Sequence, residues 1–290
     1  MTFKSTNFTA TEQISLSSEI ALIGVQSTPL TSLLMAKGNI EKALSTVYTY
    51  RAKTIDNTED LSAVEGEDTV VFHESARQEL QSILEIFKKG ASISGTAVAM
   101  KSTQFAAEIN DRLLELKISI EKKLINGKKK DGSVTPFKRQ MSGLIEFADA
   151  TNAVTSGAVT EAVVKEAMRK LWNQNLAEGT YYAIVGADIK EQIDAIYKDR
   201  YSYSHVTTNF GLLVSSISTN YGTLNLMLSK HVPADKMVIF NDAYVDLINL
   251  RSAHFEPLAK TGDSVKGHVV AETSLKVGSP KAISVVTVSA

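Results

Sequence analysis

One long amphipathic segment constrains the fold of this chain more than any other feature. Between Val98 and Asn126, apolar residues recur at steps of three and four, which places them on one face of a helix. They are Phe105, Ile109, Leu113, Leu116, Ile120 and Leu124. Charged side chains occupy much of the remaining surface, and Asn126-Gly127 is a common helix stop. At about 1.5 Å per residue the helix is roughly 40 Å long, so we expect it to be the main supporting helix of a large domain.

Length and composition exclude several classes of protein. A chain of 290 residues can hold one large domain or two intimate ones. Its 31 Lys and Arg against 32 Asp and Glu leave a formal charge of -1, so no global basic field exists to hold nucleic acid. The chain has no cysteine, which excludes disulfides, thiolate catalysis and cysteine-based metal sites. The first apolar run, Ile20 to Val25, is far too short to span a bilayer, and we expect neither secretion nor membrane insertion.

The segments before the long helix lack a core of their own. Residues 1–45 are polar and rich in Ser and Thr, which predicts an arm that buries little surface by itself. In residues 46–95, Val47 to Ile55 alternates as a strand does, and Val64 to Val71 has the pattern of a turn and a returning strand. Because an isolated hairpin is marginally stable in water, both segments need a partner surface.

The chain after the long helix has a mixed character. Lys128 to Gly132 predicts a charged turn, which is either simply solvated or a local contact for DNA or a partner. A helix is expected from about Glu161 to Asn175. We expect it to bury Val164, Met168, Leu171 and Trp172. With a strand at Tyr181 to Val185 and further strands up to Phe240, residues 151–250 predict a mixed α/β domain.

The C-terminal part predicts strands around one tight turn. His268 to Lys276 and Ile283 to Val288 alternate apolar and polar residues, which is typical of half-exposed strands. Before them, Pro257 and Gly262 frame a short polar loop. The segment Glu256-Pro257-Leu258-Ala259-Lys260-Thr261-Gly262-Asp263, here called the anchor box, resembles a box near the C-terminus of one family of tailed-phage major head proteins, members of the Hong Kong 97-type capsid fold.

Five further matches follow the same order as in that family. They are the Thr-Pro run from Thr28 to Gly38, Val64-Glu65-Gly66 in the expected hairpin, Ser94-Gly95-Thr96, the long helix, and the segment from Thr135 to Leu144. The resemblance implies an α+β fold with an N-terminal arm (1–45), an extended β-hairpin loop with an entry strand (46–95), a peripheral domain with a spine helix (96–150), an axial domain (151–250) and return strands of the peripheral domain (251–290).

The resemblance also implies a function. The chain is expected to be a major capsid protein that assembles as hexamers and pentamers into an icosahedral head around double-stranded DNA, in the virion, after assembly in the host bacterial cytoplasm. Its expected partners are other copies of itself, portal, scaffolding or decoration proteins, and packaged DNA by weak non-specific contact, with no membrane. Encapsulin nanocompartments, which share the fold and hold cargo enzymes instead of DNA, are the structural alternative.

Four residues are candidates for contacts that fix the anchor-box loop or bridge subunits. The alternative is that their side chains only interact with water at exposed turns. They are Arg139, Glu256, Lys260 and Asp263. No catalytic, cofactor-binding or metal-binding residue is predicted, because the five histidines never fall at ligand spacing on one expected element.

A remote enzyme interpretation also exists. Ser119-x-x-Lys122, Ser218-x-Asn220 and Lys260-Thr261-Gly262 follow the order of penicillin-binding motifs. That chemistry needs its serine at the start of a helix, whereas Ser119 falls late in the long helix.

Overall fold

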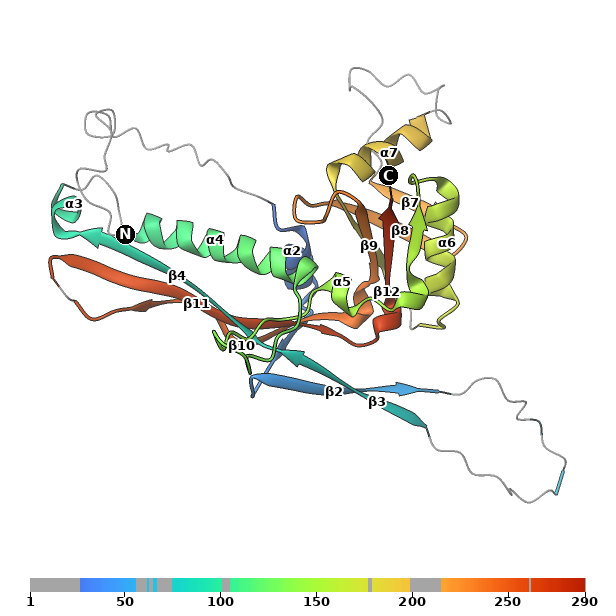
Figure 1. The fold of residues 1–290 in the computed structure, drawn as a ribbon, viewed down its shortest axis with the longest axis horizontal. Coiled ribbons are helices and arrows are strands. Elements are labelled where there is room, and N and C mark those ends of the chain that lie inside the picture. Colours follow the sequence, from blue (N-terminus) through green and yellow to red (C-terminus); the bar gives the residue numbers. More distant parts are fainter. Residues whose placement is uncertain are drawn as a thin grey trace.

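The computed structural model describes residues 27–55, 62, 65–66, 75–100, 105–176, 179–198, 215–260 and 262–289. Figure 1 shows an elongated body built on a four-stranded sheet and the long helix, beside a compact body built on a six-stranded sheet. The predicted α+β class is therefore confirmed. Most of the expected arm, residues 1–26, lies outside the described residues, and so does the expected turn and returning strand at Val64 to Val71 except for Glu65 and Gly66.

The elongated body is a ribbon of long antiparallel strands with the helix along one face. Its strand order is β1-β10-β11-β4, with β1 parallel to β10 and the other pairs antiparallel. The bounds are β1 Ile40–Lys42, β4 Glu85–Ser94, β10 Val245–Pro257, β11 Ser264–Val277, α3 Gly95–Ala99 and α4 Phe105–Asn126. The single helix expected from Val98 is two helices, because α3 ends at Ala99 and α4 begins at Phe105. The 22 residues of α4 span roughly 33 Å.

The compact body is a six-stranded sheet in the order β5-β12-β9-β6-β8-β7. Its strands are β5 Val154–Ser156, β6 Tyr181–Val185, β7 Ser216–Thr219, β8 Gly222–Leu228, β9 Lys236–Asn241 and β12 Ile283–Val288. Helices α6 (Glu161–Trp172) and α7 (Ala187–Lys198) share one core with a face of this sheet. Of the side chains expected to be buried on α6, Val164, Met168 and Leu171 are, whereas Trp172 is 60% exposed. Trp172 is the last helical residue and its ring lies beside Tyr221.

A two-stranded hairpin projects from the elongated body (Figure 1). It pairs β2 (Val47–Thr54) with β3 (Ala76–Ile83) in an unbroken antiparallel register, in agreement with the predicted strand at Val47 to Ile55. The base of the hairpin is fixed to β11: the Tyr50 hydroxyl donates to the Val277 carbonyl at 2.9 Å, and the Ser274 hydroxyl donates to the Ile83 carbonyl at 2.8 Å. Toward its far end, the side chains of β3 are mostly exposed.

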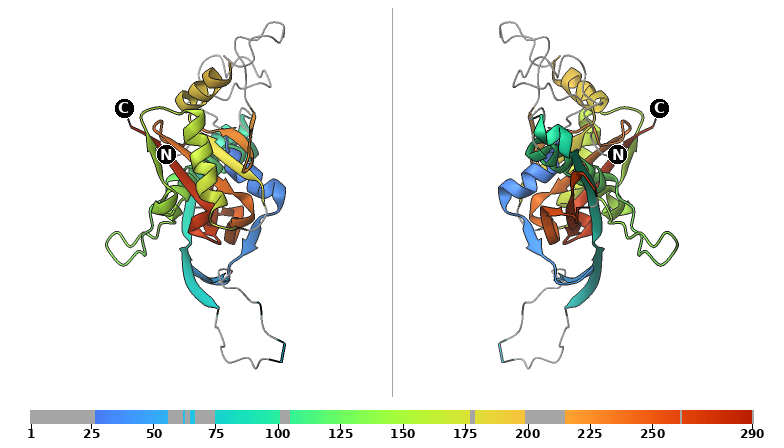
Figure 2. Two further views of the ribbon diagram at one scale, coloured as in Figure 1. Left: turned by 90° about the vertical axis from the view of Figure 1, so that its right-hand side faces the viewer. Right: turned by 90° about the vertical axis from the view of Figure 1, so that its left-hand side faces the viewer.

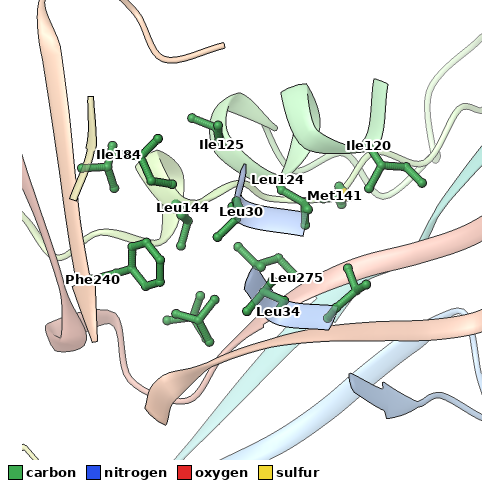
Figure 3. Close-up of a cluster of buried hydrophobic side chains, with 14 of the residues drawn as sticks. Leu30, Leu34, Ile120, Leu124, Ile125, Met141, Leu144, Ile184, Phe240 and Leu275 are labelled. Atoms are coloured by element: carbon green, nitrogen blue, oxygen red, sulfur yellow. The ribbon is translucent and has the colours of Figure 1, made fainter. Parts of the chain in front are cut away.

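Helix α2 (Pro29–Lys37), within the expected N-terminal arm, packs on the body of its own subunit, which is the kind of partner surface that the arm was expected to need. Leu30 and Leu34 are fully buried in a cluster that takes side chains from both bodies (Figure 3). At the start of α2, the buried Glu121 carboxylate of α4 accepts hydrogen bonds from the Leu30 and Thr31 amides at 2.9 and 2.8 Å, and from the Thr31 hydroxyl. These bonds satisfy donors that every helix N-terminus leaves open, and the negative charge suits the helix dipole.

The opposite end of α2 is fixed to the compact body. The Lys37 ammonium pairs with the Asp242 carboxylate, and this hydrogen bond is the largest cause that raises the pKa of Lys37. The Asn39 amide group also donates to the Asp242 carbonyl at 2.9 Å. Asp242 lies in the short helix η3 (Asp242–Tyr244) between β9 and β10. The short elements α5 (Leu144–Phe147), η2 (Ala150–Asn152) and η4 (Pro280–Ala282) complete the connections.

The C-terminal strands differ from the prediction of half-exposed return strands. In β11, every residue from Gly267 to Leu275 is buried. The reason is that α4 packs on one face of the ribbon, while the hairpin base and the loop after α4 contact the other. Strand β12 pairs with β5 and β9 in the six-stranded sheet, so residues 251–290 are divided between the two bodies. The division of the chain into domains stays a prediction.

We expect Glu121→Ala to lower the free energy of unfolding by about 2–4 kcal/mol, because it leaves buried amide donors at the start of α2 without an acceptor. Urea unfolding of the unassembled chain measures the loss. Lys122→Ala, at the exposed neighbouring position of α4, is the matched control and should change stability by no more than about 0.5 kcal/mol. Equal effects of the two changes would show that the Glu121 contacts are not stabilising.

Candidate functional site

The anchor box forms the turn between the two longest strands, at the end of the ribbon next to α3 (Figure 1). Strand β10 ends at Pro257 and β11 begins at Ser264. Two backbone hydrogen bonds close the turn, from the Leu258 amide to the Lys266 carbonyl at 3.0 Å and from the Ser264 amide to the Gly262 carbonyl at 2.9 Å. Gly262 has φ of +121°, a backbone conformation that favours glycine. Thr261 lies outside the described residues.

Asp263 joins this turn to the start of α3. Its carbonyl accepts a hydrogen bond from the Gly95 amide at 3.1 Å. Its carboxylate lies so close to Gly95 that a Cβ at that position would be 2.2 Å from Oδ1. The Ser94 hydroxyl then caps α3 by accepting from the Ala97 amide. The Ser94-Gly95 and Asp263 segments, which the sequence offered as separate family matches, are therefore in contact.

Glu256 is the centre of a cluster that sequence reasoning missed. One carboxylate oxygen lies 2.9 Å from Nε2 of His254, and the other lies 3.0 Å from Nε2 of His268. Nδ1 of His254 lies 2.7 Å from the Ser252 carbonyl. Glu256 and His268 are partners across β10 and β11, while His254 precedes Glu256 by two residues on the same strand face. The available signal was this two-residue spacing combined with strand pairing across the anchor-box turn.

The charges of this cluster stabilise one another. The Ser252 carbonyl, and after it the Glu256 carboxylate, raise the pKa of His254. The hydrogen bond from His254 is the largest cause that lowers the pKa of Glu256. The side chains of His254 and Glu256 are 46% and 41% exposed, so solvent screens their attraction.

The structure separates Arg139 from the other predicted contact residues. Its guanidinium donates to the Glu272 carboxylate at 2.8 Å, and Arg251 reaches the second oxygen of the same carboxylate at 3.2 Å. Glu272 is only 4% exposed and lies in the middle of β11. Arg139 thus fixes the loop after α4 to the ribbon, whereas Glu256, Lys260 and Asp263 lie at the anchor-box turn. Lys260 is exposed there. Whether any of the four bridges subunits stays a prediction.

The three penicillin-binding fragments do not come together. Ser119 lies on α4 of the elongated body, Ser218 lies on β7 in the compact body, and Lys260 lies at the far end of the ribbon (Figure 1). Within the described ranges, no group of three His, Asp or Glu residues could hold a metal ion. No helix in the same part of the chain is long and apolar enough to cross a membrane.

The model of the SU10 major capsid protein family matches residues 2–290 of the sequence. The chain belongs to this family. No curated protein matches the sequence of this major capsid protein. The resemblance to tailed-phage major head proteins is thereby confirmed.

Solved capsid structures share the fold of this SU10-family protein. The capsid of cyanophage A-1(L) has a TM-score of 0.68 at 11% identity, covering 93% of this chain and 94% of that chain. Microbacterium phage Oxtober96 has a TM-score of 0.65 at 12% identity, covering 94% of each chain. The SrpI encapsulin complex of Synechococcus elongatus PCC 7942 has a TM-score of 0.64 at 13% identity, covering 99% of this chain and 96% of that chain. At such identities the likeness shows the fold, and the Hong Kong 97-type prediction is confirmed.

We expect Glu256→Gln to lower the pKa of His254 toward its ordinary 6.5 without reaching it, because the Ser252 carbonyl remains. NMR titration of the histidine ring in the unassembled capsid protein measures this change. Glu191→Gln, an exposed carboxylate on α7, is the control and should leave the His254 pKa unchanged. A His254 pKa that is the same in Glu256→Gln and in the wild type would contradict the pairing.

The same pair has a defined pH window. A raised His254 pKa gives stability that is complete below 6.5 and is lost as the pH rises through the folded-state value. A lowered Glu256 pKa gives stability that is complete above 4.5 and is lost as the pH falls through its folded-state value. The pair therefore stabilises the ribbon end most between these two limits.

Proposed function

We propose that this chain is the major capsid protein of a tailed phage or prophage, which assembles as hexamers and pentamers into an icosahedral head around double-stranded DNA. The observation that carries the proposal is the family match over residues 2–290. As a member of a major capsid protein family, the chain has its place in the shell of a virion. Assembly in the host bacterial cytoplasm, before packaging, belongs to the proposal.

The physical shape of the subunit supports assembly with copies of itself. The hairpin β2–β3 stands away from the body with most β3 side chains exposed, and a two-stranded hairpin alone is marginally stable in water. A neighbouring copy that packs on it completes its burial. Repeated around a closed shell, interfaces of about 1,000–2,000 Å² each add up to a stable particle.

Further partners and chemistry follow from the same proposal. Portal, scaffolding and decoration proteins are expected to contact the shell. With a formal charge of -1, the subunit would hold packaged DNA only by weak, local contacts. We infer a purely structural role without catalysis, cofactor or metal, which the family membership supports.

An encapsulin-like nanocompartment is the second candidate, because the SrpI encapsulin matches 99% of this chain with a TM-score of 0.64. The two candidates differ in their contents. Shells that protect DNA from nuclease favour the phage head, whereas shells that retain a cargo enzyme and no DNA favour the nanocompartment.

The purified recombinant chain is expected to form closed shells, or rings of five and six subunits. Negative-stain electron microscopy and size-exclusion chromatography at low and high salt test this directly. A compact monomer at every concentration and salt would contradict the proposed function.

Replacing Lys260 and Asp263 together by Ala should give a folded subunit that assembles poorly, because the anchor-box turn loses the Asp263 carboxylate beside Gly95 and the exposed charge of Lys260, while the backbone hydrogen bond to Gly95 remains. Shell yield by electron microscopy is the readout, and urea unfolding checks the fold. Lys230→Ala, another exposed lysine, is the control. Normal shells from the double variant would remove Lys260 and Asp263 from the assembly contacts.

A further inference from the structure

Two segments of this nearly neutral chain carry strong and opposite charge. Between Ile55 and Ser75, the residues that follow β2 and precede β3, the sequence has seven carboxylates and no Lys or Arg. They are Asp56, Glu59, Asp60, Glu65, Glu67, Asp68 and Glu74. The loop 128–139, here called the basic loop, has five cations and one carboxylate. Its charged residues are Lys128, Lys129, Lys130, Asp131, Lys138 and Arg139.

Hydrogen bonds from backbone amides hold the basic loop in place. Lys130 and Gln140 exchange two backbone hydrogen bonds of 3.0 Å across its neck. Its base is fixed by the Lys129 amide, which donates to the Glu146 carboxylate at 2.7 Å, and by the Met141 amide, which donates to the buried Glu85 carboxylate at 3.1 Å. Figure 2 shows the loop, in green, standing away from both sheets. The loop is therefore a preformed surface.

The cations of this loop differ in their ion pairing. Arg139 is committed to Glu272, while Lys128, Lys129, Lys130 and Lys138 are exposed. Within the described part of the chain, these four ammonium groups form no ion pair with a carboxylate. Asp131, the one acid, accepts from the Ser133 amide and hydroxyl at 2.9 and 2.7 Å and so faces its own turn. With five cations against one carboxylate, the loop presents net positive charge to its surroundings.

The basic loop also has a hollow that suits a polypeptide. A cavity of about 660 Å³ opens between its two sides. Lys129, Lys130 and Lys138 line it together with Val134 and Pro136. Val134 and Phe137 are 76% and 69% exposed at the tip. Cations beside exposed apolar side chains fit a segment of mixed acidic and apolar residues, and the sequence around Val64, Val70 and Phe72 has this composition.

We propose that, in the assembled shell, the acidic segment 56–74 of one copy docks on the basic loop of a neighbouring copy. This inference rests on the proposed function. The eight-residue strands of the hairpin carry the residues that flank the segment, Ile55 and Ser75, roughly 27 Å from the hairpin base, away from their own subunit. Each exposed ion pair contributes little by itself, so the contact depends on salt and sets which surfaces meet.

Two charge-reversed variants test the docking. The loop variant changes Lys128, Lys129, Lys130 and Lys138 to Glu, and the tip variant changes Asp60, Glu65, Glu67 and Asp68 to Lys. Each variant alone brings like charges together and is expected to give fewer than about a tenth of the wild-type shells at about 0.1 M salt. A control with the same charge change at exposed lysines elsewhere should assemble as the wild type does; it changes Lys122, Lys165, Lys230 and Lys281 to Glu.

Mixing the two variants distinguishes docking between copies from docking within one copy. Every contact from a loop variant to a tip variant again joins opposite charges, so the equal mixture should form hexameric rings in which the two alternate. Docking of the segment on its own loop predicts no rescue in the mixture, and that result would overturn the proposal. A chain that carries both sets of changes has complementary charges again and should assemble, which shows that the substituted segments still fold.

The remaining outcomes are equally decisive. Normal shells from the loop variant overturn the proposal, and if those shells also hold less DNA, the basic loop belongs to nucleic acid instead. A wild-type chain that forms no shells contradicts the proposed function, and the docking fails with it. Wild-type shells, together with failure of both single variants and rescue by their mixture, support it.

Discussion

The buried carboxylate of Glu121 is the interaction on which the rest of the subunit depends. It begins α2 by accepting the amides of Leu30 and Thr31, and α2 then carries Leu30 and Leu34 into the cluster where the two sheets meet. The Lys37 pair with Asp242 fixes the same helix at its other end. A charged group without these partners would be too costly to bury, so the helix, its cap and the core require one another.

Patterns that are local in the sequence predicted much of this fold. Apolar spacing located most of α4, and alternating or continuous apolar runs located β2, β6 and β9, because a helix or strand face is set by neighbours along the chain. The burial of β11 was missed because its polar residues Glu272, Thr273 and Ser274 find partners only in the folded molecule. Trp172 was wrongly expected to be buried. Successive residues of a helix point in different directions, so the residue after the buried Leu171 faces away from the sheet.

Part of the candidate site was also predictable from local sequence patterns, and part of it was not. Pro257 and Gly262 predicted the anchor-box turn. Proline restricts the backbone and glycine gives it more freedom, and both effects are local to the residue. The contact between Gly95 and Asp263, the pairing of Arg139 with Glu272 and the link from Glu256 to two histidines depend on strand register and loop path. Such contacts join residues distant in the sequence and leave no local pattern, whereas the family resemblance placed the whole chain in its class.

The continuous core has a mechanical consequence. The largest apolar cluster among the described residues contains Leu275 and Val277 from the ribbon together with Ile184 and Phe240 from the six-stranded sheet, so one apolar core runs through both bodies. Because close-packed interiors resist deformation, this shared core opposes bending at the join between the two bodies. A closed shell contains positions of different curvature, around its five-fold and its six-fold rings. The projecting hairpin, whose β3 side chains are mostly exposed and lie outside this core, would adapt to those differences more easily than the join between the two bodies.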